Sequence, residues 1–416
     1  MPTTPHLVRL TVLGLVVMIL VVLALCTQPR RASQPPKISF VLGGTAPEAS
    51  LEFLNCTAKL ASMQAAQFPA HDFMQSACTE HVWLDHFQAQ RPHGDHIIID
   101  IGCNKGYHVA ESLDLFTPEL GVNKHSLRDA LGAQQQAAGW PPNALLCGAC
   151  DVITRPDGSV GEKESCRQRR STAQHSPGQV APRRLELHCV EPSDRNYALL
   201  LRSRQMLFGN VSSAPPERGP LSLQRGAASA TWHIHNMAVS NFSGTAAFTS
   251  GCDTELCHLE SGPAGGAGGG AGGAAAGPGQ YRVQVVTVDE VMARWVGAGR
   301  RASLLKIDTE GFDPDVLQGA RTTLDQQAVD LVVFEYHNLG RWKEQQLADV
   351  VPWMAARGYV CYFESQPFIY KLSRGCWNPK YEIKNWSNVV CGRAGDWPEL
   401  LLDAHSYLRQ LAPRAA

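Results

Sequence analysis

The chain has 416 residues and a nearly balanced charge, with 37 basic and 38 acidic side chains and a net charge of −1. Hydrophobic residues make up 44% and charged residues 18%, a balance that excludes a wholly disordered chain. Without a basic excess, the composition argues against a nucleic-acid-binding protein. The 13 cysteines are unusual, and their meaning depends on whether the chain enters an oxidising compartment.

An apolar N-terminal segment, residues 7–26, predicts a membrane signal anchor. Residues 10–26 contain no charged side chain. A membrane-spanning helix needs about 20 apolar residues, whereas the apolar core of a cleaved signal peptide needs only about 7–15. The length therefore favours an uncleaved anchor. A cleaved signal peptide stays the alternative, because Ala24 and Cys26 are small residues near a possible cleavage site.

Two sets of sequence features make opposite predictions about the side of the membrane on which the residues after the anchor lie. Arg30, Arg31 and Lys37 follow the apolar segment, which favours a cytoplasmic body by the positive-inside rule. The other cysteines and four Asn-X-Ser/Thr sequons favour a lumenal body. The sequons begin at Asn55, Asn210, Asn241 and Asn385. We predict a single-pass protein of the endoplasmic reticulum or Golgi with a lumenal body.

The chain beyond the anchor divides into four segments. Residues 27–50 are a polar, proline-rich stem, and residues 51–95 carry apolar positions typical of a helical preamble. Residues 96–395 alternate short apolar runs with helical stretches, which predicts an α/β domain with a mostly parallel sheet. Residues 396–416 are a tail with an amphipathic helical pattern.

Within the α/β domain the expected elements follow one another in a regular order. The expected core strands are 97–101, 185–191, 233–240, 304–308 and 331–337, and the expected helices include 197–207 and 315–324. Residues 359–364 and 368–372 predict an antiparallel hairpin that finishes the sheet. Two long loop insertions, 118–184 and the glycine-alanine stretch 261–280, interrupt the order.

A glycine-rich turn, DIGCNKG, follows the first strand and contains Asp100, Gly102, Asn104 and Gly106. Glycines at such a turn let the backbone approach a ligand at the N-terminus of the next helix. The spacing differs from the Gly-x-Gly-x-x-Gly of dinucleotide sites, and the preceding acid suits a cationic or zwitterionic ligand. Glu191 ends the second strand, where an acid can hold both ribose hydroxyls; a solvated strand-end carboxylate is the alternative.

A third motif, LLKIDTEGFDPDVLQGA, contains an apolar strand followed by a turn, and it places Asp308 and Glu310 at the carboxyl end of that strand. Open α/β sheets bind their ligands at this end. With this block the sequence resembles the FkbM family of S-adenosylmethionine-dependent methyltransferases. The other matching motifs are DIGCNKG, VEP, NMAVS with NFSG, VVTVDEV and LVVFEYH, and together they span residues 96–340.

The resemblance implies a Rossmann-like methyltransferase fold with S-adenosylmethionine as cofactor. Asp308 and Glu310 are then the signature acids near the transferred methyl group. The residues implied to bind the cofactor lie in the glycine turn, at the ribose and beside the adenine: Asp100, Gly102, Asn104, Gly106, Glu191, Met237 and Ala238.

Transfer of a methyl group to an alcohol needs alignment of the reactants and a base that removes the hydroxyl proton. Asp308, Glu310 and His337 are the candidates for this base, since all three should emerge at one edge of the sheet. The alternative for His337 is a histidine bonded to a backbone carbonyl. Glu335 is expected to be a structural or positioning acid. No metal site is predicted, because no cluster has diagnostic ligand spacing.

The cysteines divide by position. Cys103 and Cys189 lie beside the proposed site and are expected to be small buried residues. Cys252–Cys257 and Cys376–Cys391 are the candidate local disulfides. Disulfides are favoured over a zinc site for the remaining cluster, which comprises Cys147, Cys150 and Cys166.

The expected function is that of an O-methyltransferase whose catalytic part is lumenal and whose acceptor is a hydroxyl of a sugar or glycoconjugate. The expected partners are this acceptor and the membrane, with no nucleic acid. Two alternatives stay open: a nicotinamide-dependent oxidoreductase on a Rossmann fold, and a non-catalytic lumenal binding module on a methyltransferase fold. The acceptor atom and the oligomeric state are not predicted.

Overall fold

The structure is a computed structural model. It describes residues 53–68, 81, 83–84, 86–87, 94–138, 152–154, 160–162, 183–209, 218–249, 280–365 and 367–411. Several sequence predictions lie outside these residues: the anchor 7–26, the stem 27–50, the sequon at Asn210, the glycine-alanine stretch up to residue 279, and Cys147, Cys150, Cys166, Cys252 and Cys257.

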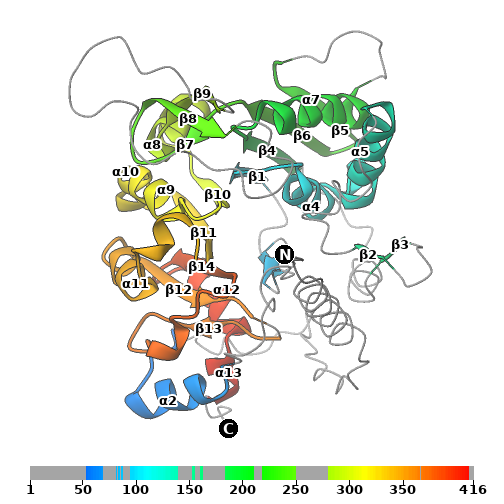
Figure 1. Ribbon diagram of the computed structural model, residues 1–416. Helices are drawn as coiled ribbons and strands as arrows, with labels where there is room; N and C mark the ends of the chain where they lie inside the picture. Colours follow the sequence, from blue (N-terminus) through cyan, green and yellow to red (C-terminus); the bar gives the residue numbers. More distant parts are fainter. Residues whose placement is uncertain are drawn as a thin grey trace, which may run out of the picture. The chain divides into compact units, whose positions relative to one another are not determined.

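Nine of the described strands form one large sheet (Figure 1). Their spatial order is β13 (Tyr370–Lys371), β12 (Tyr359–Phe363), β14 (Ser387–Arg393), β11 (Val329–Tyr336), β10 (Ala302–Ile307), β1 (Gly94–Ile101), β4 (Arg183–Val190), β6 (Ala228–His235) and β5 (Leu221–Arg225). The five strands from β11 to β6 are parallel. The expected α/β class with a large, mostly parallel sheet is therefore confirmed.

The chain order of the strands reverses direction at β1, which pairs with β4 on one side and β10 on the other. In open α/β sheets, ligands bind at the carboxyl ends of the strands beside such a switch point. Continuous apolar runs form these strands because helices cover both faces of the sheet. The fold therefore places Asp100, Glu191 and Asp308, which lie at or directly after the ends of β1, β4 and β10, along one edge.

The antiparallel end of the sheet contains a strand that the sequence analysis did not assign. β14 lies between β11 and β12 and runs antiparallel to both. β12 and β13 pair antiparallel, with Tyr362 opposite Lys371, and β13 lies at the edge of the sheet. β12 thus reaches the rest of the sheet through β14, not through β11.

The third expected strand, 233–240, ends earlier than predicted. β6 stops at His235, and Ala238–Val239 forms β7 in a separate three-stranded sheet with β8 (Gly244–Thr249) and β9 (Gln280–Val286). The turn between the sheets is held by Asn236, whose side-chain amide donates to the Glu191 carbonyl oxygen at 3.2 Å. A third, two-stranded sheet pairs β2 (Val152–Thr154) with β3 (Val160–Glu162).

Helices cover both faces of the large sheet (Figure 1). One face packs against α4 (Tyr107–Phe116), α7 (Asp194–Phe208) and α12 (Trp397–His405). The other face packs against α8 (Val288–Val291), the π-helical turn η3 (Met292–Val296), α9 (Asp313–Gly319), α10 (Arg321–Asp325) and α11 (Leu347–Ala355). The remaining helical elements are η1 (Pro118–Leu120), α5 (Lys124–Ala138), η4 (Gly340–Lys343), η5 (Pro379–Tyr381) and α13 (Tyr407–Leu411).

Three of these α-helices, α5, α12 and α13, lie in segments that were predicted to be an insertion or a tail. α5 lies within 118–184 and packs against α7 through Leu127, Leu131 and Leu199. The tail forms α12 and α13, with a break between them at Ser406. None of the helices in the described ranges has the length and apolarity that a bilayer crossing requires.

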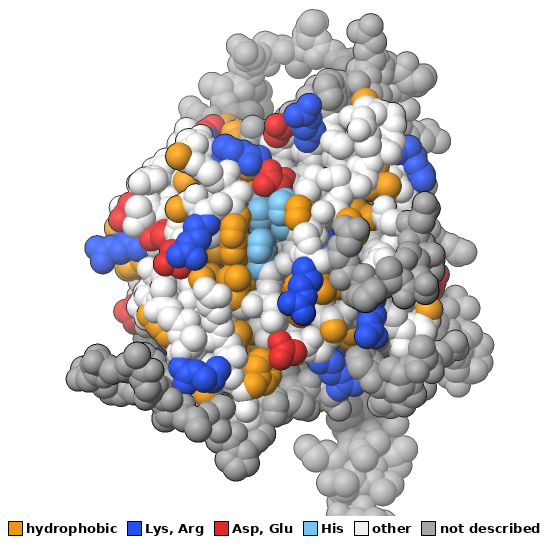
Figure 2. Space-filling view, turned by 90° about the horizontal axis from the view of Figure 1, so that it is seen from above, with side chains coloured by type: hydrophobic (Ala, Val, Ile, Leu, Met, Phe, Trp, Pro, Cys, Tyr) orange, Lys and Arg blue, Asp and Glu red, His pale blue; other side chains and the backbone are white. Residues whose placement is uncertain are grey.

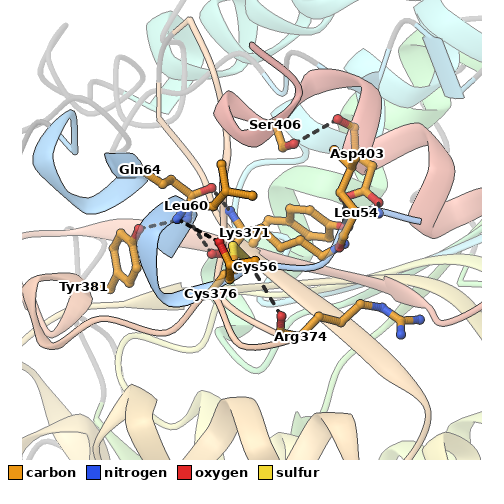
Figure 3. The surroundings of a disulfide bond; sticks show 12 residues. Leu54, Cys56, Leu60, Gln64, Lys371, Arg374, Cys376, Tyr381, Asp403 and Ser406 are labelled. Carbon is orange, nitrogen blue, oxygen red and sulfur yellow. Dashed lines mark hydrogen bonds and ion pairs between the residues drawn. A yellow bond between two sulfur atoms is a disulfide. The ribbon is translucent and has the colours of Figure 1, made fainter. Parts of the chain in front are cut away.

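The N-terminal helix α2 (Ala58–Ala66) is tied to the antiparallel end of the sheet (Figure 3). A disulfide joins Cys56 to Cys376, which is 320 residues away in sequence. The Gln64 side-chain amide donates to the Lys371 carbonyl oxygen at 2.8 Å and to the Tyr381 hydroxyl at 2.9 Å. One covalent bond and several buried hydrogen bonds therefore join the two ends of the described chain.

Lys371 is the charged centre of this junction. Its ammonium group is fully buried and contacts Asp403 Oδ1 at 2.7 Å and Glu399 Oε1 at 3.1 Å. It also donates to the Leu54 carbonyl oxygen at 2.6 Å. A buried charge needs such compensation, because an unpaired one would cost several kcal/mol. The junction thus stabilises the edge of the sheet that lies away from the switch point.

Candidate active site

The turn after β1 packs tightly against the end of β10. Gly102 has φ +77° and Gly106 has φ +86°, both in the left-handed region that favours glycine. A Cβ atom on Gly102 would lie 1.7 Å from the Asp308 carbonyl oxygen, and one on Gly106 would lie 2.8 Å from Leu200. The Asp308 amide donates to the Ile101 carbonyl oxygen at 2.9 Å. Gly102 is therefore needed for the close approach of the two backbones, and Gly106 for its left-handed conformation beside the Leu200 side chain.

Asp100 lies at the switch point with 1% of its surface exposed. Its carboxylate is 3.4 Å from His108 Nδ1 and 3.7 Å from the Lys306 ammonium group. Burial acts to raise the pKa of Asp100, but the charges of Lys306 and His108 outweigh it, and the pKa lies below its usual value. Asp100 is therefore an ionised acid directly before the glycine turn.

Glu191 joins the end of β4 to the same turn. One carboxylate oxygen accepts the Asn104 amide hydrogen at 2.8 Å, and the other accepts that of Ser193 at 2.9 Å. Burial raises the pKa of Glu191 to about 7, although these hydrogen bonds act to lower it. Only 4% of the residue is exposed, so the alternative of a solvated strand-end carboxylate is wrong.

Three further residues support Glu191 and were missed by the sequence analysis. The Asn196 amide group donates to the Asn104 side chain at 3.2 Å, and the Tyr281 hydroxyl donates to the Pro192 carbonyl oxygen at 2.8 Å. Asn236, described above, donates to the Glu191 carbonyl oxygen. Single asparagine and tyrosine residues carry no distinctive sequence pattern, so only the fold reveals the role of these three side chains.

Met237 and Ala238 follow β6 at the same edge of the sheet. Met237 is half-buried against the core, and Ala238 is buried and pairs with Val285 of β9. The structure therefore places both residues one strand beyond Glu191. Their predicted contact with an adenine ring stays a prediction.

The cysteines beside the turn form a disulfide between Cys103 and Cys189. Both cysteines are buried, as expected, but the disulfide between them was not predicted. Parallel pairing sets Cys189 opposite Asp100, and the turn then brings Cys103 back over the end of β4. The disulfide links the strand that precedes Glu191 to the glycine turn.

The expected Cys376–Cys391 disulfide is also wrong. Cys391 pairs with Cys361, directly opposite it in the β12–β14 ladder, while Cys376 pairs with Cys56. Nearness in sequence suggested the wrong partner, because β14 and the N-terminal segment bring distant cysteines closer. The Cys252–Cys257 prediction lies outside the described residues.

A second group of functional side chains lies at the ends of β10 and β11. Asp308 Oδ2 is 2.7 Å from the Lys306 ammonium group. Glu310, Glu335 and His337 each place one potential ligand atom within 4.8 Å of the others. We call these last three residues the acid–histidine cluster. Since His337 was expected at this edge, the fold brings together Glu310 and His337 as predicted and adds Glu335.

His337 is fully buried in this cluster. Its Nε2 atom lies 3.6 Å from Glu335 Oε2, and its ring stacks on Trp386 with centroids 4.7 Å apart. Within the part of the chain that the structure describes, neither ring nitrogen forms a hydrogen bond. The alternative of a histidine bonded to a backbone carbonyl is therefore wrong.

The electrostatics of the cluster favour a neutral imidazole. Burial lowers the pKa of His337 to about 4, although the negative charge of Asp308 acts to raise it. Burial and the nearby charges of Asp308, Glu310 and Asp313 raise the pKa of Glu335 well above its usual value. At pH 7 the imidazole of His337 is therefore neutral, which is the form that can accept a proton.

Asp313 has a structural role in the same region. Its carboxylate accepts hydrogen bonds from the Glu335 amide at 3.2 Å and the Gly311 amide at 3.3 Å. Burial, followed by the charge of Asp308, raises the pKa of Asp313 to about 7. These hydrogen bonds hold the turn after β10 against β11, and they thereby fix the positions of Asp308 and Glu310.

The acid–histidine cluster contains the residue types that bind divalent ions. No ligand spacing in the sequence predicted it, because Glu310 follows one strand while Glu335 and His337 come from the next. The cluster could hold a metal ion, or it could serve as a base with an orienting acid.

Comparison with known proteins adds one match. No curated protein and no solved structure matches the chain significantly. The family model described as the methyltransferase FkbM domain matches residues 220–361. This range contains Met237, the signature acids and His337, whereas Asp100 and Glu191 precede it. The resemblance of the sequence to the FkbM methyltransferases is therefore confirmed, through the match of residues 220–361 to the family's domain.

Proposed function

We propose that this protein is an S-adenosylmethionine-dependent O-methyltransferase that acts on a hydroxyl group. The observation that carries the proposal is the contact between buried Glu191 and the backbone of the glycine turn at Asn104. This contact joins the two predicted cofactor-binding elements, the glycine turn and Glu191, at the edge of the sheet where Asp308 follows β10. The methyltransferase family match supports the same reaction class.

The residues at this edge fit S-adenosylmethionine chemically. Each Glu191 oxygen accepts one backbone hydrogen bond, and a carboxylate oxygen has a second lone pair for a ribose hydroxyl. Gly102 and Gly106 let the turn adopt its left-handed conformations and pack against Asp308 and Leu200. Ionised Asp100 supplies a negative charge suited to the cationic groups of this cofactor. When bound, the cofactor supplies an electrophilic methyl group on a sulfonium.

We assign the general base to His337. The bound cofactor would supply the methyl group, and a ring nitrogen of His337 would take up the proton that the acceptor hydroxyl loses. Asp308 is a weaker candidate, because its carboxylate already forms an ion pair with Lys306 at 2.7 Å. Glu335, 3.6 Å from His337, is placed to orient the ring and to tighten its contact when substrate is bound.

The proposed compartment is the lumen of the secretory pathway, with membrane attachment through residues 7–26. The disulfides among the described residues support an oxidising environment. The sequon residues Asn55, Asn241 and Asn385 are exposed, as glycosylation requires. A sugar or glycoconjugate hydroxyl is the acceptor class that suits this location.

We expect wild-type full-length protein to transfer label from methyl-labelled S-adenosylmethionine to at least one member of a glycan panel. Asp100→Ala should reduce the transfer at least about 100-fold, which corresponds to about 2.7 kcal/mol of transition-state stabilisation. The reason is that the change removes the buried carboxylate between Lys306 and His108. Mass analysis of the glycans measures the methyl gain.

Asp95→Ala is the matched control, because Asp95 is an exposed residue of the same strand. This variant should retain wild-type transfer. Full activity of Asp100→Ala would contradict the assignment of the cofactor site. Transfer to a non-sugar hydroxyl, with no glycan labelled, would contradict the acceptor class alone.

A further inference from the structure

Three histidines lie together on one face of the large sheet, near the carboxyl ends of β4 and β6. His188 belongs to β4, and His233 and His235 belong to β6. Parallel pairing sets His188 opposite His233, and residues two apart on a strand share a face. Histidine side chains form a patch at the surface in Figure 2, in agreement with the half-buried state of His233 and His235.

The distances among the three imidazoles suit a shared metal ion. One nitrogen from each ring lies within 4.8 Å of the others, and His188 Nδ1 is 3.2 Å from His235 Nε2. Two nitrogens bound to one tetrahedral zinc ion at 2.0–2.1 Å are roughly 3.3 Å apart. The rings of His188 and His233 stack at 4.5 Å, so the half-buried His233 ring would rotate to complete the site.

An outer carboxylate orients the central ligand. Glu186 Oε1 lies 2.9 Å from His188 Nε2, and Glu186 Oε2 accepts from Arg300 at 2.6 Å. A carboxylate that accepts from one imidazole nitrogen leaves the other nitrogen with its lone pair free for a metal. His188 Nδ1 is therefore directed to the position between the three rings. This pairing of acid, histidine and metal recurs around protein metal sites.

An aromatic side chain lies against the histidine group on one side. Trp295 stacks on His235 with centroids 3.6 Å apart and forms an apolar wall at one side of the group.

We propose that His188, His233 and His235 bind one divalent transition-metal ion of the zinc class, with Glu186 as the outer carboxylate. Three imidazoles favour zinc, copper or nickel over magnesium or calcium. Because His233 and His235 are half-buried, the fourth coordination position faces the surface. The ion links β4 to β6, the strands that lead to Glu191 and Met237, and therefore stabilises the nucleoside side of the proposed cofactor site.

Titration of the chelator-treated full-length protein with Zn²⁺ against a chromophoric indicator tests this site. The double variant His233→Phe with His235→Phe keeps two rings for stacking and removes two ligands. We expect it to bind one equivalent fewer than wild type, or to bind that equivalent at least about 100-fold more weakly. Glu186→Gln should lower the affinity for the same equivalent of Zn²⁺ by about 10- to 100-fold.

Two controls separate this site from others. His125→Phe on α5 and His337→Gln in the acid–histidine cluster should both retain the equivalent that the double variant loses. Zn²⁺ should raise the melting temperature of wild type but not of the double variant. Equal stoichiometry and affinity in wild type and the double variant would overturn the proposal. The readout is metal binding, so it is independent of methyl transfer.

Discussion

The Gly102→Ala variant should fail to fold or lose more than about 4 kcal/mol of unfolding free energy, and it should lose S-adenosylmethionine binding. The added Cβ atom would lie 1.7 Å from the Asp308 carbonyl oxygen, and both groups belong to backbone that cannot move independently. The Asp308 amide is bonded to the Ile101 carbonyl oxygen, so any shift breaks the β1–β10 pairing at its last residue. Chemical denaturation of both proteins measures the loss.

Gly132→Ala is the matched control for this substitution. Gly132 lies within α5, and an added Cβ atom there would meet nothing within 4 Å. Because alanine is a better helix former than glycine, this variant should be neutral or more stable by up to about 1 kcal/mol. A Gly102→Ala protein as stable as Gly132→Ala, with unchanged cofactor affinity, would show that the turn does not pack as described.

The His337→Gln variant should lower kcat about 10²- to 10⁴-fold and leave the Kd for S-adenosylmethionine unchanged. Glutamine retains a polar side chain of similar length but cannot accept the hydroxyl proton. Neutral His337 is the active form, and its pKa lies at about 4. Wild-type kcat/KM should therefore fall as the pH drops through about 4, and the variant should lack this decrease. Single-turnover rates across pH values at which the protein stays folded measure both effects.

His405→Gln is the control for a partly buried histidine whose pKa is lowered to a similar value. Burial also lowers the pKa of His405 to about 4, but His405 ends α12 and lies outside the acid–histidine cluster. This variant should retain wild-type kcat. A His337→Gln protein with kcat within a factor of two of wild type would show that another group accepts the proton, and Glu310 would then be the next candidate.

The central strands could be predicted from the sequence because their signals are local. β1, β10 and β11 each contain a continuous apolar run, which is the pattern of strands covered on both faces, and β4 has apolar residues at alternate positions. The glycine turn and the acids after β10 were likewise predicted, since they directly follow these runs. β14 was missed because the segment SNVVCGR is short and its place between β11 and β12 depends on distant pairing.

The disulfides and the group of three histidines could be identified only from the fold. Cys103 and Cys189 are 86 residues apart, and Cys56 and Cys376 are 320 apart, so no spacing pattern joins them. The histidines of β6 alternate visibly in the sequence, but their partner His188 is selected by the register of β4 against β6. The acid–histidine cluster likewise combines residues from two strands. Such sites depend on strand order, which local periodicity does not contain.

The central claim is that the glycine turn and Glu191 bind S-adenosylmethionine, and a calorimetric titration of the full-length protein tests it most directly. The same protein should be titrated separately with S-adenosylmethionine and with NAD⁺, the cofactor of the alternative oxidoreductase. We predict saturable binding of S-adenosylmethionine with one site per chain, weakened by Glu191→Ala, and no binding of NAD⁺. Absence of S-adenosylmethionine binding at millimolar concentration, or preferential binding of NAD⁺, would contradict the account.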